Sequence, residues 1–454
     1  MPGSVGLTSQ HVRMDQLDHT FYRELRDASP VMRAADGEGG SARTALACDL
    51  WATYYKPAPQ LEPIDRVEDG YHCNRPLVER AMADPSTAAT RGITQLDEMA
   101  AALAAVAALG AIGKEIRERP ELQQLRAMWE GGVPDPEALA APETARAVRR
   151  AVRAAAQAAA KEADEYLTCL SGWGLEPADL KRVAPDERWT VLARLRNPQL
   201  RAVADRIGRI RTLARRQRRQ RPKHGRDELH AIEQGADLAR ILPSELGALS
   251  HPLRKLDFYR RLLEQQTLQY QLVERPREGR GPMVVCVDCS GSMGEHGRMT
   301  WAAGVALALV DEAQRTRRAA YVLPFNGALL PSIRFDPRRR DPEALLRVAQ
   351  LGPSGGTNYT PPLDRALDLI RAGGSLQGAD VVLITDGICH VPDDWITHWT
   401  EDRQALGCRS FGIYIAEAAG GLAPYVLGRV CDKTWRVSTA PGDDEAADIF
   451  AEVG

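Results

Sequence analysis

The carboxyl-terminal part of the chain, from about residue 282, alternates short apolar runs with longer amphipathic segments. The apolar runs predict strands, and apolar residues at three- and four-residue spacing predict helices between them. This alternation is typical of an α/β fold with a doubly wound, mostly parallel sheet and helices on both faces. The predicted strands are 284–287, 319–325, 329–335, 381–385, 410–415 and 434–437. The predicted helices are 300–317, 342–349, 361–371 and 395–406.

The part of the chain before residue 274 has a helical period and predicts a mostly α-helical region. Residues 1–90 are mixed but mostly helical, residues 91–273 predict a helical domain, and residues 274–281 predict a linker to the carboxyl-terminal domain. We expect one helix to begin at Thr94, with Asp97 completing a capping box. A later predicted helix bears the apolar residues Leu256, Tyr259, Leu262, Leu263 and Tyr270.

Composition indicates a soluble protein of two or three domains, because 454 residues exceed one ordinary core. Hydrophobic residues make up 44% and charged residues 26%, and the formal net charge of -2 argues against a generally basic nucleic-acid binder. The first residues lack the pattern of a secretory signal, and the stretch 99–112 is mostly alanine and too short to span a bilayer. We therefore expect a cytoplasmic protein, with peripheral association at the inner membrane as an alternative.

The eight cysteines are scattered along the chain without a disulfide-module pattern, which favours a reducing compartment. Cys286 and Cys289 form a C-x-x-C pair that zinc or redox sites also use. No second such pair is present, and this one spans the end of a predicted buried strand. We therefore interpret the two cysteines as small residues packed at a loop.

Three loops carry oxygen-bearing side chains at corresponding places. Asp288, Ser290 and Ser292 follow the first predicted strand, Asp386 follows the strand 381–385, and Thr357 lies on a glycine-rich loop between them. Carboxyl ends of parallel strands meet at one edge of a sheet, where such folds bind ligands. Carboxylate and hydroxyl oxygens suit Mg²⁺ or Mn²⁺ better than zinc. The pattern predicts a magnesium or manganese site without catalytic residues.

The D-x-S-x-S sequence of Asp288, Ser290 and Ser292 resembles the first motif of von Willebrand factor A domains. Thr357 and Asp386 match the second-loop threonine and third-loop aspartate of that family. The resemblance implies an α/β von Willebrand A domain over residues 282–454 with a complete metal-ion-dependent adhesion site. In this family the metal binds a carboxylate of a partner protein, so an Asp or Glu of a client is the expected last ligand.

The most basic stretch of the chain, residues 215–226, follows a predicted helix whose apolar face ends at Leu213. A solvated linker, a contact with an acidic protein, and a contact with phosphates of lipid or RNA all fit its charge. No aromatic residue lies among the arginines, which weakens the case for stacking on single-stranded nucleic acid. The possible contact residues are Arg215, Arg216, Arg218, Arg219, Arg221 and Lys223.

A narrower resemblance comes from three segments before the metal loops: 241–246 (Ile-Leu-Pro-Ser-Glu-Leu), 258–262 (Phe-Tyr-Arg-Arg-Leu) and the Gly281-Pro282 entry to the first strand. They look like the ViaA-like von Willebrand A proteins, the partner class of MoxR-type AAA+ ATPases such as RavA. The resemblance implies a non-enzymatic adapter that presents clients to such an ATPase or regulates it.

Three other functions fit parts of the sequence. An RNA-binding protein of the Ro type and a metal-chelatase subunit also carry A domains, but no regular helical repeat and no acidic run is present. His296 and His390 follow two of the metal loops and raise the possibility of catalysis. We expect no enzyme, because the loops offer no lysine, no phosphate-binding glycine motif and no evident general base.

Overall fold

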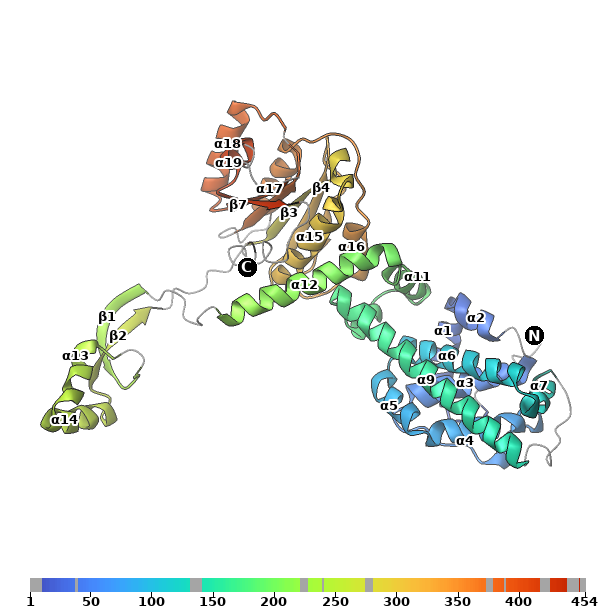
Figure 1. Cartoon of the computed structure of the whole chain (residues 1–454). Coiled ribbons are helices and arrows are strands. Elements are labelled where there is room, and N and C mark those ends of the chain that lie inside the picture. Colours follow the sequence, from blue (N-terminus) through green and yellow to red (C-terminus); the bar gives the residue numbers. More distant parts are fainter. Residues whose placement is uncertain are drawn as a thin grey trace. The chain divides into compact units, whose positions relative to one another are not determined.

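In a computed structural model of the chain, the carboxyl-terminal apolar runs form a six-stranded sheet (Figure 1). The strand order is β5-β4-β3-β6-β7-β8, and every neighbouring pair is parallel except β4 and β5. Both central strands are fully buried, as expected of parallel strands covered on two faces. The strands are β3 (Met283–Asp288), β4 (Ala320–Phe325), β5 (Ile333–Phe335), β6 (Asp380–Thr385), β7 (Arg409–Ala416) and β8 (Lys433–Ser438).

The structure describes only part of the chain in full. The described residues are 10–36, 40–130, 141–220, 228–238, 241–273, 281–372, 379–387, 389–416, 425–438 and 449. Contacts divide the chain into two units, which we describe separately. One comprises Met1–Gly208 with Arg339–Gln350, and the other Arg209–Arg338 with Leu351–Gly454.

Helices cover the sheet because alternate strand residues point to opposite faces. Val284, Cys286 and Leu383 point into one core, which α17, α18 and α19 complete. Helix α15 packs on β3 and β4. The helices of this unit are α15 (Arg298–Arg315), α17 (Thr360–Ala372), α18 (Asp393–Ala405) and α19 (Tyr425–Val430). Helix α16 (Pro342–Ala349) belongs to the other unit. The predicted α/β fold is confirmed, although β5 is shorter than expected and Leu329 makes only an isolated bridge to Phe325.

The amino-terminal region is predominantly helical, as predicted. Its largest contact joins α6 and α9, and the aromatic rings of Trp51 and Tyr55 stack in the core. The helices are α1 (Gln16–Ala28), α2 (Pro30–Asp36), α3 (Gly40–Tyr55), α4 (Arg75–Ala83), α5 (Pro85–Thr94), α6 (Glu98–Glu118), α7 (Gln123–Trp129), α9 (Pro142–Trp173), α10 (Pro177–Leu180), α11 (Pro185–Leu195) and α12 (Pro198–Gln220). Short 3-10 turns occur at Ile64–Arg66, Asp69–Asn74 and Pro120–Leu122.

The predicted helix start at Thr94 is wrong. Thr94 is the last residue of α5, and its hydroxyl donates a hydrogen bond to the Tyr54 carbonyl at 2.9 Å. Asp97 is the N-cap of α6, because its carboxylate accepts hydrogen bonds from the backbone N–H groups of Met99 and Ala100. The correct cap therefore lies three residues later than predicted.

Helix α6 is also longer than the apolar stretch in the sequence suggested. At 21 residues it is long and apolar enough to cross a membrane by length and composition alone. Within its most apolar window, however, 67% is buried in the protein. It packs against α3 and α9, as the central helix of a folded core does.

A small α/β segment lies between the helical region and the six-stranded sheet in the sequence. It comprises β1 (Glu228–Gly235), α13 (Pro243–Leu246), a 3-10 turn (Gly247–Ser250), α14 (Pro252–Leu263) and β2 (Thr267–Val273), with β1 and β2 antiparallel. The prediction of one helix reaching Tyr270 is wrong. Gln265 has a left-handed φ of 57° and ends the turn after α14, and the alternating sequence beyond it forms β2.

Candidate metal centre

The register of the central strands brings two of the predicted loops together. Val287 of β3 lies opposite Ile384 of β6, so Asp288 is level with Thr385 and Asp386 follows directly. The Thr385 hydroxyl donates a 2.5 Å hydrogen bond to Asp288 Oδ2, and the Ser290 N–H donates a 2.8 Å hydrogen bond to Asp288 Oδ1. Both oxygens of this buried carboxylate are therefore held in place before any ion binds.

The second loop is tied to the first by backbone hydrogen bonds. The Gly291 N–H donates to the Gly355 carbonyl at 3.0 Å, and the Ser354 N–H donates to the Cys289 carbonyl at 2.6 Å. Gly355 has a φ of +73°, a conformation that favours glycine, so this turn requires glycine at position 355. The two contacts place Thr357 on the same edge of the sheet as Asp288.

The third loop approaches the second so closely that a side chain would not fit. A Cβ atom added to Gly387 would lie 2.8 Å from Thr357 Oγ1. The Tyr359 hydroxyl also donates a 2.5 Å hydrogen bond to the Gly387 carbonyl. The structure thus brings together the three loops that carry all five predicted ligands.

The hydroxyl oxygens have the spacing that a small octahedral ion requires. Ser290 Oγ and Ser292 Oγ are 3.2 Å apart, and the Ser292 hydroxyl donates a 2.8 Å hydrogen bond to Asp386 Oδ1. Adjacent ligands of Mg²⁺ bound at 2.0–2.1 Å are separated by roughly 2.9 Å in an octahedron. Only small shifts are needed for the two serines to act as neighbouring ligands, so the residues present fit magnesium or manganese.

Electrostatics at Asp288 also favour a cation. Burial raises the pKa of this carboxyl, and the hydrogen bonds from Thr385 and Ser290 act in the opposite direction. The nearby negative charge of Asp386 raises the Asp288 pKa further. A divalent cation would offset both the lost hydration and the repulsion between the two carboxylates.

Sequence reasoning missed a positive charge at this site. Arg298, the first residue of α15, donates from Nη1 to Asp386 Oδ2 at 2.6 Å and to the Ser292 carbonyl at 3.2 Å. The Arg298 side chain is 5% exposed and that of Asp386 is 0% exposed. The available signal in the sequence was a charged residue just before the apolar stretch of a predicted helix.

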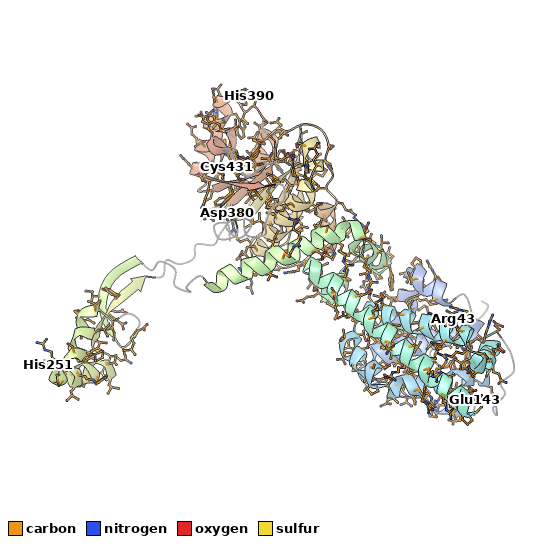
Figure 2. All side chains as sticks on the ribbon, in the orientation of Figure 1. Arg43, Glu143, His251, Asp380, His390 and Cys431 are labelled. Atoms are coloured by element: carbon orange, nitrogen blue, oxygen red, sulfur yellow. The ribbon has the colours of Figure 1, made fainter. Side chains whose placement is uncertain are left out.

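The cysteines and histidines near the loops do not assemble a second metal site in the described part of the chain. Cys286 and Cys289 are buried free thiols, and burial raises the pKa of Cys289 to about 12. His296 and His390 are exposed, and His390 lies beyond the carboxyl end of β6 whereas Asp380 begins that strand (Figure 2). Among the described residues, no group of three or more His, Cys, Asp or Glu side chains could hold an ion.

The basic stretch lies partly on α12 and partly beyond it. Arg215, Arg216, Arg218 and Arg219 fall on the last turns of this helix, whereas Arg221 and Lys223 lie outside the described residues. Its predicted role in binding an anionic partner stays a prediction.

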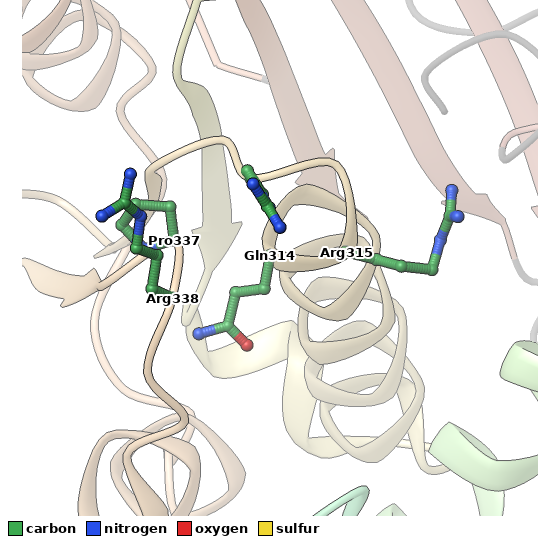
Figure 3. Close-up of a pocket in the computed structure, with 5 residues that line it drawn as sticks. Gln314, Arg315, Pro337 and Arg338 are labelled. Carbon is green, nitrogen blue, oxygen red and sulfur yellow. The ribbon is translucent and has the colours of Figure 1, made fainter.

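A pocket of about 630 Å³ lies at the edge of the sheet opposite the metal loops (Figure 3). Its lining comes from the end of α15 and the turn after β5, and includes Gln314, Arg315, Arg317 and Arg338. Arg315 is paired with Glu312 at 2.8 Å, and in Figure 3 its side chain points away from Gln314. The pocket is therefore separate from the candidate metal centre.

A family comparison agrees with the geometry of these loops. Residues 283–388 match the model of the von Willebrand factor type A domain. The carboxyl-terminal sheet is a von Willebrand A domain. The match begins with β3 and includes all five predicted ligands, whereas the rest of the chain lies outside it.

Two relatives are uncharacterized proteins of Methanocaldococcus jannaschii. MJ0811 is 24% identical over 414 residues, which is 90% of each chain. MJ0077 is 29% identical over 222 residues, which is 49% of this chain and 55% of that protein. One similar solved structure is a von Willebrand factor type A protein from Catenulispora acidiphila, at 14% identity and a TM-score of 0.31, covering 41% of this chain and 44% of that one.

Proposed function

We propose that this chain is a non-enzymatic adapter that binds a partner protein through a Mg²⁺ or Mn²⁺ ion in its von Willebrand A domain. The observation that carries the proposal is the convergence of Asp288, Ser290, Ser292, Thr357 and Asp386 from three loops tied to one another. These residues offer two carboxylates and three hydroxyls, a set that small hard cations prefer.

The residues would hold the ion while leaving part of its coordination sphere to others. Mg²⁺ takes about six ligands and commonly keeps several waters. Ser290 and Ser292 are spaced as neighbouring ligands, and Asp288 is prepared for its role by two donated hydrogen bonds. When bound, the ion would supply a positive centre that the carboxylate of a partner's Asp or Glu can complete.

The same geometry argues for binding rather than catalysis. A general base needs an oxygen or nitrogen with access to the proton that it removes. Both oxygens of Asp288 and both oxygens of Asp386 already accept hydrogen bonds from protein donors. Each carboxylate is thus committed to the arrangement of the loops, which suits a fixed adhesive site.

For the partner, we propose a MoxR-type AAA+ ATPase, together with clients that this chain presents to it. The support is the resemblance of residues 241–262 and the following strand to ViaA-like proteins. The small α/β segment that includes residues 241–262, from β1 to β2 (228–273), exposes several large hydrophobic side chains. Its exposed large hydrophobic residues are Ile232, Leu238, Leu246, Leu249, Leu256, Tyr259, Leu263 and Leu268. A concentration of exposed apolar side chains is typical of a protein-binding surface.

The proposal is tested by capture of a MoxR-type ATPase from the same host on the purified full-length chain. We expect binding in Mg²⁺, weaker binding in EDTA, recovery when Mg²⁺ is restored, and failure with Asp288→Asn. Arg317→Ala serves as the control because it alters the opposite edge of the sheet. Equal capture by the EDTA-treated chain and by Asp288→Asn would remove the metal from the mechanism. Absence of capture under every condition would remove the ATPase.

A further inference from the structure

The buried ion pair between Arg298 and Asp386 has no counterpart in the pattern of five oxygen ligands. Arg298 Nη1 lies 2.6 Å from Asp386 Oδ2, and the Ser292 hydroxyl donates a 2.8 Å hydrogen bond to Asp386 Oδ1. Both Asp386 oxygens are therefore engaged by the protein. We propose that Arg298 sets the charge of the metal centre and thereby selects a carboxylate as the last ligand of the ion. This inference rests on the proposed metal-binding function.

The position of Arg298 is electrostatically unfavourable without such a role. It is the first residue of an 18-residue helix, where the backbone dipole opposes a positive charge. It is also almost fully buried, which costs the guanidinium its hydration. A buried ion pair commonly gives little net stability compared with apolar residues of similar size. Stability alone therefore does not account for an arginine at this place.

Charge counting shows what Arg298 changes. The carboxylates of Asp288 and Asp386 contribute two negative charges, and Arg298 compensates one of them. A divalent ion then leaves the centre with one net positive charge, which one carboxylate neutralises. Without Arg298 the loaded centre is neutral before the partner arrives, and a carboxylate would leave it negative. Arg298 thus lowers the affinity for the metal and raises the affinity of the loaded site for an anion.

The geometry also assigns a position to Asp386. Because Arg298 and Ser292 hold its two oxygens, Asp386 would act on a bound ion through the Ser292 hydroxyl rather than as a direct ligand. Arg298 is accordingly a positioning residue. It also donates to the Ser292 carbonyl at 3.2 Å, so it fixes the residue that carries the bridging hydroxyl.

The expected effects follow from Coulomb's law. For a monovalent and a divalent cation about 6 Å apart, repulsion in water alone corresponds to roughly a tenfold loss of affinity. At the same separation, one positive charge strengthens the binding of a monovalent anion about threefold. Both effects grow where the surroundings are less polar than water.

The experiment measures Mn²⁺ binding to the full-length chain by electron paramagnetic resonance, followed by acetate binding to the loaded protein through the relaxation of water protons. Acetamide serves as the uncharged control ligand. For Arg298→Gln we expect Mn²⁺ affinity to rise at least tenfold and acetate affinity to fall at least threefold. Arg298→Lys retains the charge and is expected to resemble the wild type in both measurements. Circular dichroism verifies that each variant is folded.

A matched control is available at the other end of β6. Arg318 pairs with Asp380 at 2.7 Å and is also buried. Asp380 is the first residue of β6 and so lies at the amino end of the strand (Figure 2). Arg318→Gln should therefore change neither Mn²⁺ nor acetate binding.

Several results would overturn the inference. They are unchanged or weaker Mn²⁺ binding by Arg298→Gln, unchanged acetate binding, or equal effects of Arg318→Gln. Failure of the proposed function is distinguishable. If the wild-type chain binds no Mn²⁺ but Arg298→Gln does, Arg298 prevents metal binding. The native protein would then not use a metal ion, and the proposed function would fail. No binding by either chain would overturn both proposals.

Discussion

Replacing Asp386 with alanine should destabilise the von Willebrand A domain even in the absence of metal. The carboxylate is the partner of Arg298, and both side chains are buried. Alanine would remove the carboxylate that pairs with this buried guanidinium. Removing one partner of a buried pair costs about 3–5 kcal/mol of unfolding free energy. For a domain of this size, that loss corresponds to a melting temperature lower by roughly 6–20 °C.

The second step is a double-mutant cycle. Arg298→Met removes the charge and keeps a long apolar side chain, so the double variant Asp386→Ala, Arg298→Met contains neither charge of the pair. We expect the double variant to recover at least half of the stability that Asp386→Ala loses, because buried pairs replaced by apolar residues are often neutral. The coupling energy should exceed about 1 kcal/mol, as for residues in direct contact.

The assay must report on the sheet alone, because a chain of two units need not unfold in one step. Urea titration in EDTA, read by hydrogen exchange of peptides from β3 and β6, satisfies this condition. Asp386→Asn is the milder control, since its amide can still accept the Ser292 hydrogen bond. Wild-type stability in Asp386→Ala would refute the reasoning, and so would a double variant that is no more stable than Asp386→Ala.

Three further predictions concern the metal, the basic stretch and the apolar surface. Mg²⁺ at 100 times its Kd should stabilise the wild-type domain by about 2.7 kcal/mol, or roughly 5–11 °C in Tm by scanning fluorimetry, and Asp288→Asn should show no such shift. Replacing four arginines of the basic stretch with serine should leave Tm within about 2 °C of the wild-type value. The change should weaken one salt-sensitive interaction in titrations against anionic vesicles, RNA and the ATPase. A large fall in Tm would show that these arginines are structural. Those positions are Arg215, Arg216, Arg218 and Arg219. The side chains of Leu256 and Leu263 are 70% and 85% exposed, so the double variant Leu256→Ser, Leu263→Ser should change the unfolding free energy by less than about 1 kcal/mol. The same variant should reduce capture of the ATPase. Unchanged capture would show that this surface does not bind the ATPase.

The sequence predicted the α/β domain well because its signals are local. Buried parallel strands read as continuous apolar runs, and β3 and β6 lie within a residue of their expected bounds. Two predictions failed where two local signals competed. Thr94 and Asp97 are both good caps, and only the packing of Thr94 against the Tyr54 carbonyl decides between them. The prediction of a helix reaching Tyr270 was wrong because the apolar stripe of α14 is followed, after only a short turn, by the alternating residues of β2.

The five candidate ligand residues could be chosen from the sequence, whereas the side chains that contact them could not. Thr385 is a partner of Asp288 because β3 and β6 pair in one particular register, and Arg298 is a partner of Asp386 because α15 begins beside the third loop. Neither relation is visible in the spacing of residues along the chain. The motif therefore identifies the atoms that can contact an ion, whereas the neighbouring residues determine the net charge of the site. Two domains with the same five ligands would differ in metal affinity and in the preferred last ligand if only one of them carried an arginine at the position of Arg298.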